Sequence, residues 1–172
     1  MAIQPVSKDI YSGYNCKLDV IVRGTGTAAP AGNSPLWDSN GNVLFVGTGF
    51  RSGASCEVTE KHGLGQQRPY ATKQGYLKYD FSIDSLYTID RYYTDNDGAN
   101  YDILELIDNG VVLDIRVTLY DGIGEDSAKT PVKYIVLGGC SLESSDFEVG
   151  ADKDASSAMR GKAESRTISA PT

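Results

Sequence analysis

Apolar and polar residues alternate along most of the chain with the period of two that is typical of β-strands. In residues 17–23, Leu18, Val20 and Val22 fall on one face, while Lys17 and Asp19 lie on the other. This segment is therefore expected to be a strand with one wet side. The same alternation predicts further strands over residues 54–61, 76–87, 111–120, 132–140 and 142–150, with a last strand over 158–167.

Turn residues divide these strands. Polar residues 62–75 separate two long strands, which predicts an arm-like hairpin with a mobile tip that serves contact. Asn40 and Gly41 lie between apolar runs and predict a second hairpin. Residues 24–35 are rich in Gly, Ala, Thr and Pro, and residues 151–157 are small or charged. Both segments are expected to be loops.

One helix is predicted, over residues 100–109. Asn100 suits its start as a cap, and Gly110 suits a left-handed stop after it. A kink is expected at Gly138 and Gly139, after which the sheet continues. The sum is a single domain over residues 1–172, mainly β, with about seven or eight antiparallel strands and one short helix.

Composition and charge limit the classes of function that the chain is expected to have. The 172 residues carry a net charge of −7, whereas a protein that grips nucleic acid needs a basic patch to displace counterions from phosphate. No apolar run approaches the roughly 20 residues of a membrane span. The segment 1–8 shows no signal-peptide pattern, so folding in a cytoplasm is expected. Passage of DNA without binding stays compatible with the charge.

No group of residues predicts catalysis, a cofactor or a metal. His62 is the single histidine and has no evident nucleophilic partner in the sequence. Residues 95–102 resemble a calcium loop, but Glu105 is one residue out of register for the closing ligand, so a turn is the better interpretation. Asp80 and Asp84 would lie about 13 Å apart on one strand, too far for a glycosidase pair. The protein is expected not to be an enzyme.

Three cysteines, Cys16, Cys56 and Cys140, form no CxxC pair. Two interpretations stay open for them: buried reduced thiols, or a disulfide between subunits that forms after release from the cell.

The order of the elements carries a family resemblance. A glycine-bearing strand over 49–54 leads into the hairpin of 55–87; a helix over 101–109 and the strand 111–120 follow. In residues 134–143, a strand, glycines and a small kink precede a final strand. This order resembles the tail tube proteins of contractile-tailed bacteriophages over most of residues 51–168. Residues 24–46 look like a loop or hairpin insertion, and the chain lacks the acidic, aromatic C-terminal ending common in that family.

The resemblance implies an antiparallel β-sandwich or half-barrel with one flanking helix, which closes into a barrel only on assembly. Six copies would form a ring, and stacked rings would form the inner tail tube, a passive acidic conduit for DNA. The implied partners are further copies of the chain and the tail sheath, tape-measure, baseplate hub and tail terminator proteins. The implied location is the tail of a virion assembled in the cytoplasm of a bacterial host.

Residue roles follow from this arrangement. The acidic side chains Glu57, Asp80 and Asp84 are expected to line the lumen, where they would repel phosphate. The tip of the arm is expected to bridge adjacent rings, and its candidate contact residues are His62, Leu64, Gln66, Arg68 and Tyr70.

Two alternatives remain. A tube terminator or decoration protein would share the sandwich but form single rings or trimers. A carbohydrate-binding sandwich module would suit the eleven tyrosines and the lone Trp37, and would be a soluble monomer.

Overall fold

The computed structural model describes residues 16–23, 29–35, 37, 47–65, 67–69, 71–86, 93–94, 100–101, 105–121, 130–151 and 153–171. Within them the chain is mainly antiparallel β-structure with one short helix, as predicted. The elements are β1 (Cys16–Val22), β2 (Gly47–Lys61), β3 (Ala71–Leu86), β4 (Tyr93–Thr94), β5 (Asn100–Tyr101), α2 (Glu105–Asp108), β6 (Val112–Asp121), β7 (Thr130–Gly150), β8 (Lys153–Ala163) and β9 (Ser165–Ser169).

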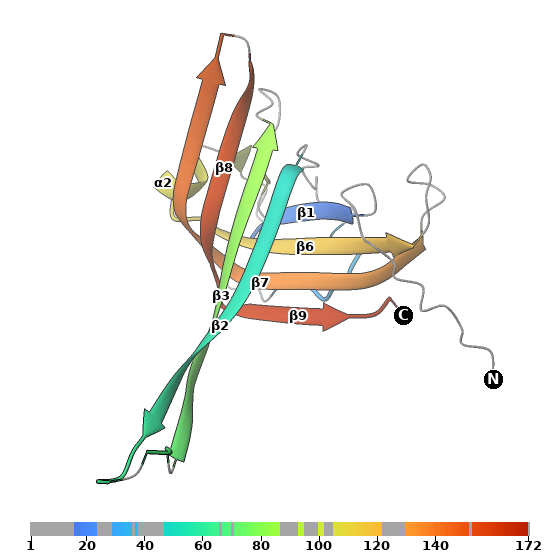
Figure 1. The fold of residues 1–172 in the computed structure, drawn as a ribbon. Coiled ribbons are helices and arrows are strands. Elements are labelled where there is room, and N and C mark those ends of the chain that lie inside the picture. The colour runs from blue at the N-terminus through green and yellow to red at the C-terminus, as the bar shows by residue number, and fades with distance from the viewer. Residues whose placement is uncertain are drawn as a thin grey trace, which may run out of the picture.

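Two sheets share the long strand β7. Its first half pairs with β6 and β9, while its second half pairs with β8. The first sheet, called the β6 sheet, consists of β1, β6, β9 and residues 130–141 of β7. The second, called the β3 sheet, consists of β2, β3, β8 and residues 141–150 of β7. The strands of the two sheets cross steeply, and β7 bends from one direction into the other (Figure 1).

The predicted kink at Gly138 and Gly139 is the point where β7 changes sheets. Gly139 has a φ of 64°, in the left-handed region that favours glycine, and a side chain there would overlap Glu164. The backbone N–H of Gly139 donates a hydrogen bond to Asp114 of β6 at 3.0 Å. The bend is therefore specified by a glycine and held by a carboxylate of the neighbouring strand.

The main core lies between the two sheets. The β6 sheet contributes Val20, Leu113 and Leu137, and the β3 sheet contributes Ile83 and Met159, all of them buried. Helix α2 adds Leu106, which has no exposed surface. Burying a side chain of this size stabilises a fold by about 2 kcal/mol. The side of the β3 sheet that faces away from this core carries exposed side chains, among them Asp80 and Asp84.

The other face of the β6 sheet is buried too, which corrects one expectation. β1 was expected to have a wet face carrying Asp19, but Asp19 has no exposed surface. Its carboxylate pairs with Arg116 of β6 at 2.6 Å, and Arg116 lies over the rings of Trp37 and Tyr134 at 5.3 and 5.4 Å. Residues 31–35 and Trp37 supply the cover, since Arg116 also donates to the Gly32 carbonyl and the Trp37 ring N–H donates to the Ala31 carbonyl.

A second ion pair lies beside the first. Arg23 donates two hydrogen bonds to Asp114, at 3.1 and 2.5 Å, and these bonds raise the pKa of the Arg23 guanidinium. A buried charge is stable only with such a partner. The polar positions of β1 and β6 therefore hold paired charges instead of meeting solvent.

The predicted helix over 100–109 is wrong at its start, residues 100 and 101. Asn100 and Tyr101 form β5, which pairs with β4, so Asn100 does not cap a helix. Pairing with Tyr93 and Thr94 of β4 has overridden the local capping signal. Among the described residues the helix is Glu105–Asp108, and it stops as predicted at Gly110, whose φ is 61°.

The loop predicted over 151–157 is also wrong, because residues 153–157 begin β8. They pair with β7, and Ser156 and Ser157 pair with β3 as well. Small side chains fit a strand between two neighbours, and Ser157 is 3% exposed. The predicted hairpin at Asn40 and Gly41 lies outside the described residues.

Candidate functional site

The face of the β3 sheet that points away from the core carries polar side chains. Along β3, Phe81 and Ile83 are buried in the core, whereas the alternate residues Asp80 and Asp84 are exposed. Two of the three side chains expected to line a lumen therefore share this face. We call it the polar face of the β3 sheet.

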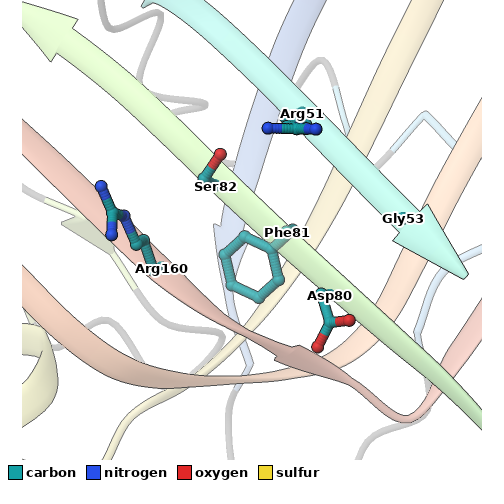
Figure 2. A pocket seen from close by; sticks show the side chains of 6 residues that line it. All are labelled: Arg51, Gly53, Asp80, Phe81, Ser82 and Arg160. Carbon is teal, nitrogen blue, oxygen red and sulfur yellow. The ribbon is translucent and has the colours of Figure 1, made fainter. Parts of the chain in front are cut away.

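Cross-strand pairing arranges this polar face in rows. Ser82 of β3 is directly opposite Arg51 of β2 and Arg160 of β8. One row further along, Asp80 is opposite Gly53 and Lys162. Figure 2 shows Arg51, Ser82 and Arg160 on three neighbouring strands. The sequence did not single out these arginines, because only the strand register brings them together.

Cations and anions are therefore mixed on the polar face. Lys162 donates to Glu143, and this hydrogen bond raises the pKa of the lysine. On the other side of the arginine row, Ala158 of β8 has two acidic cross-strand partners, Asp84 of β3 and Asp146 of β7. The surface alternates in sign along the strands instead of being uniformly acidic.

The third lumen candidate, Glu57, lies further along β2. A register shift between Cys56 and Val58 leaves Glu57 without a directly opposite partner, beside Gly75 of β3. Its side chain is exposed, but it belongs to the arm and lies apart from the rows that hold Asp80 and Asp84.

Both edges of the β3 sheet lack a strand partner among the described residues. β2 pairs only with β3, and residues 142–150 of β7 pair only with β8. The sheet order from β2 through β3 and β8 to β7 contains three antiparallel pairings. β2 and β7 therefore run in opposite directions. A sheet with two free edges exposes backbone N–H and C=O groups that another chain can pair with.

The predicted arm is confirmed. β2 and β3 pair from Gly47 to Lys61 and extend well beyond the two sheets (Figure 1). Its tip carries His62, Leu64 and Arg68, all exposed, while Gln66 and Tyr70 lie outside the described residues. His62 lies 3.5 Å from Glu60 across exposed surface, a weak contact.

Exposed apolar side chains gather at the two ends of the β3 sheet. Leu64 and Tyr76 are on the arm, and Tyr76 is 90% exposed. Phe147 and Val149 are at the opposite end, where β7 meets β8, and are 46% and 63% exposed. Apolar groups at two separated ends of one molecule suit contact between copies arranged in a line.

No protein family model and no curated protein sequence matches the chain. Solved structures do match. A chain of the sheath–tube complex of an extracellular contractile injection system in its extended state aligns with a TM-score of 0.59 and 11% identity, over 95% of this chain and 94% of that one. The SPP1 tail tube aligns with a TM-score of 0.59 and 10% identity, over 94% of this chain and 80% of that one. The chain has the tail-tube fold.

A third match is a chain in the structure of the anti-feeding prophage cap. It aligns with a TM-score of 0.58 and 12% identity, over 99% of this chain and 95% of that one. The resemblance inferred from the order of strands is thus confirmed at the level of the fold.

The three cysteines of this tail-tube fold have different surroundings. Cys140 has no exposed surface, and burial raises the pKa of its thiol to about 12. Burial also raises the pKa of the half-buried Cys16. Cys56 is half-buried on the arm, and all three are free thiols in this single chain. The disulfide between copies stays a prediction.

Within the ranges given above, no three His, Cys, Asp or Glu side chains are grouped as metal ligands would be. Most of the calcium-like segment 95–102 lies outside those ranges. No helix in the described part of the chain has the length and apolar character needed to cross a membrane.

Proposed function

We propose that this protein is the structural subunit of a tail tube. Copies join side by side into a ring through the free edges of the β3 sheet, and rings stack into a tube. The observation that carries the proposal is a pair of edges, β2 and the second half of β7, that have no further strand partner among the described residues and run in opposite directions on one four-stranded sheet.

The direction of these edges fits a ring. Rotation about an axis roughly parallel to the strands places β2 of one copy beside β7 of the next and preserves both directions. The junction is then antiparallel, like every other pairing in the sheet. The result is one continuous antiparallel barrel, and closure removes the edges that would otherwise recruit other chains. The resemblance to phage tubes implies six copies in the ring.

The polar face of the β3 sheet then forms the lumen wall, since its other face is filled by the core. Asp80 and Asp84 project into the channel, and Glu57 lies toward its end. The overall charge of −7 opposes tight binding of DNA. The conduit therefore lets DNA pass, and the subunit acts without catalysis.

The two apolar ends of the β3 sheet form the contacts between rings. The arm of one ring, with His62, Leu64 and Arg68, reaches the next ring near the hairpin that carries Phe147 and Val149. This contact is head to tail and does not close, so it generates a tube of open length. In a virion the tube would meet the sheath, tape-measure, baseplate hub and terminator proteins.

Electron microscopy of the purified protein at high concentration tests the proposal. Regular hollow tubes are the expected result. A stable monomer at every salt and protein concentration would refute it.

Single rings that never stack would favour a second function, that of a tube terminator. The similarity to the tube-terminating cap of the anti-feeding prophage, with a TM-score of 0.58, supports this alternative. The length of the assembly decides between the two functions.

A further inference from the structure

Two arginines on the polar face of the β3 sheet flank one serine. Arg51 of β2 and Arg160 of β8 are both directly opposite Ser82 of β3, so the three form a row across neighbouring strands. Two strand spacings separate the arginine backbones, which is about 10 Å. All three residues line a hollow of about 510 Å³ together with Gly53, Asp80 and Phe81 (Figure 2).

Neither arginine of this row is neutralised. Among the residues with assigned positions, no carboxylate forms an ion pair with Arg51 or Arg160, although both side chains are exposed. Arg23 and Arg116, in contrast, each pair with a buried aspartate. Two unpaired guanidinium groups held on one small surface create a local positive potential in a chain of net charge −7.

We propose that Arg51, Ser82 and Arg160 form a binding site for a phosphate group. A guanidinium presents two parallel N–H donors that match two phosphate oxygens, and the serine hydroxyl between the arginines supplies a further donor. Two arginines can reach one anion from opposite sides of the hollow. Asp80 lines the same hollow and repels an anion, so the site binds weakly and releases its ligand readily.

The role of the site in a tube rests on the proposed function, whereas the site itself does not. In a ring the row repeats once in each copy and forms a positive band around the lumen. Acidic residues lie on both sides of this band: Asp84 and Asp146 on one side, Asp80 and Glu143 on the other. The backbone phosphates of passing nucleic acid would meet alternating attraction and repulsion, instead of a uniformly acidic wall.

Titration of the soluble, unassembled subunit tests the site, with inorganic phosphate and a short single-stranded oligonucleotide as separate probes. Arg51→Gln and Arg160→Gln are each expected to weaken phosphate binding roughly tenfold, the effect of losing one charge-assisted contact. Arg68→Gln is the matched control, because it removes the same charge from the exposed arm tip. It is expected to change the affinity less than about twofold.

Nuclear magnetic resonance of the unmutated protein gives a measurement that does not depend on variants. Phosphate is expected to shift the amide signals of Ser82 and its cross-strand neighbours, and not those of the arm tip. Equal losses in Arg51→Gln and Arg68→Gln would overturn the site, as would no binding by the unmutated chain. Binding of inorganic phosphate without the oligonucleotide would support the site and refute its role toward nucleic acid.

These results are distinguishable from those on assembly. Tubes in the microscope with no phosphate binding by the subunit would refute the site and leave the tube. Phosphate binding by a chain that never forms tubes would refute the tube and leave the site.

Discussion

Gly139 is the residue on which the shape of the subunit most depends. Its left-handed backbone lets β7 turn from one sheet into the other, and its N–H is held by Asp114, itself paired with Arg23. A side chain at this position is strained by the φ of 64°, whereas the exposed Glu164 side chain that an added Cβ would meet is able to move aside.

Gly139→Ala is expected to lower the free energy of unfolding by about 1–2 kcal/mol, because a residue with a Cβ is strained at this left-handed φ. Chemical denaturation measures the change. Gly53→Ala is the control: Gly53 is an exposed strand glycine with nothing within 4 Å of an added Cβ, and a change below about 0.5 kcal/mol is expected. Equal effects at the two sites would contradict this account of the bend.

Residue patterns predicted the glycine bend but missed the buried charges. Two adjacent glycines in an apolar strand indicate a kink without further information. The pairing of Asp19 with Arg116 depends on the register of β1 against β6. Arg51 and Arg160 likewise become neighbours only through β3. Alternation predicts which face of a strand is polar, and it does not predict what covers that face or which charges meet there.

At the scale of elements, the sequence predicts the arm correctly and places the start of the helix wrongly. Two long alternating segments around a polar stretch specify a hairpin through local signals alone. The segment before α2 has a local capping signal as well, but pairing of β5 with β4 overrides it. The first residues of β8 are small or charged, which by itself indicates a loop. Pairing with β7, and from Ser156 onward also with β3, makes them a strand.

The arm is exposed along most of its length, so its tip contributes little to the stability of the single chain. Leu64→Asp is expected to change the free energy of unfolding by less than about 0.5 kcal/mol, because the side chain is fully exposed in the single chain. In the assembly it would place a charge in an apolar contact between rings. Electron micrographs are therefore expected to show rings or short stacks in place of long tubes.

Ile168→Asp serves as the control for this prediction. Ile168 is also an exposed apolar residue, at 57%, but it lies on β9 of the other sheet, away from the proposed contact between rings. Normal tube length in Ile168→Asp and shortened tubes in Leu64→Asp are expected. Tubes of normal length in both variants would remove the arm tip from the proposed contact.

At the scale of the whole molecule, neither edge of the β3 sheet has a strand partner among the described residues. Within the same residues, the backbone of β2 pairs with β3 on one side only. Residues 79–85 of β3, by contrast, pair with strands on both sides. Assembly is therefore expected to change the protection of β2 and to leave that of β3 unaltered.

Hydrogen exchange followed by mass spectrometry measures this difference. Peptides that cover residues 47–55 are expected to exchange at least about tenfold more slowly in tubes than in the free subunit, because their outward N–H groups gain partners. Peptides that cover residues 79–85 provide the internal reference. Unchanged exchange in residues 47–55 after tube formation would show that β2 is not the ring-forming edge.

The strand β7 also bears on how the molecule carries force. In the proposed tube, a pull on the channel wall would reach the other sheet along covalent bonds, because the single peptide backbone of β7 runs through both sheets and turns at Gly139. The joints between copies would consist of hydrogen bonds and side-chain contacts, which are far weaker than a peptide chain. A tube under tension is thus expected to part between subunits, leaving each subunit whole and able to join again.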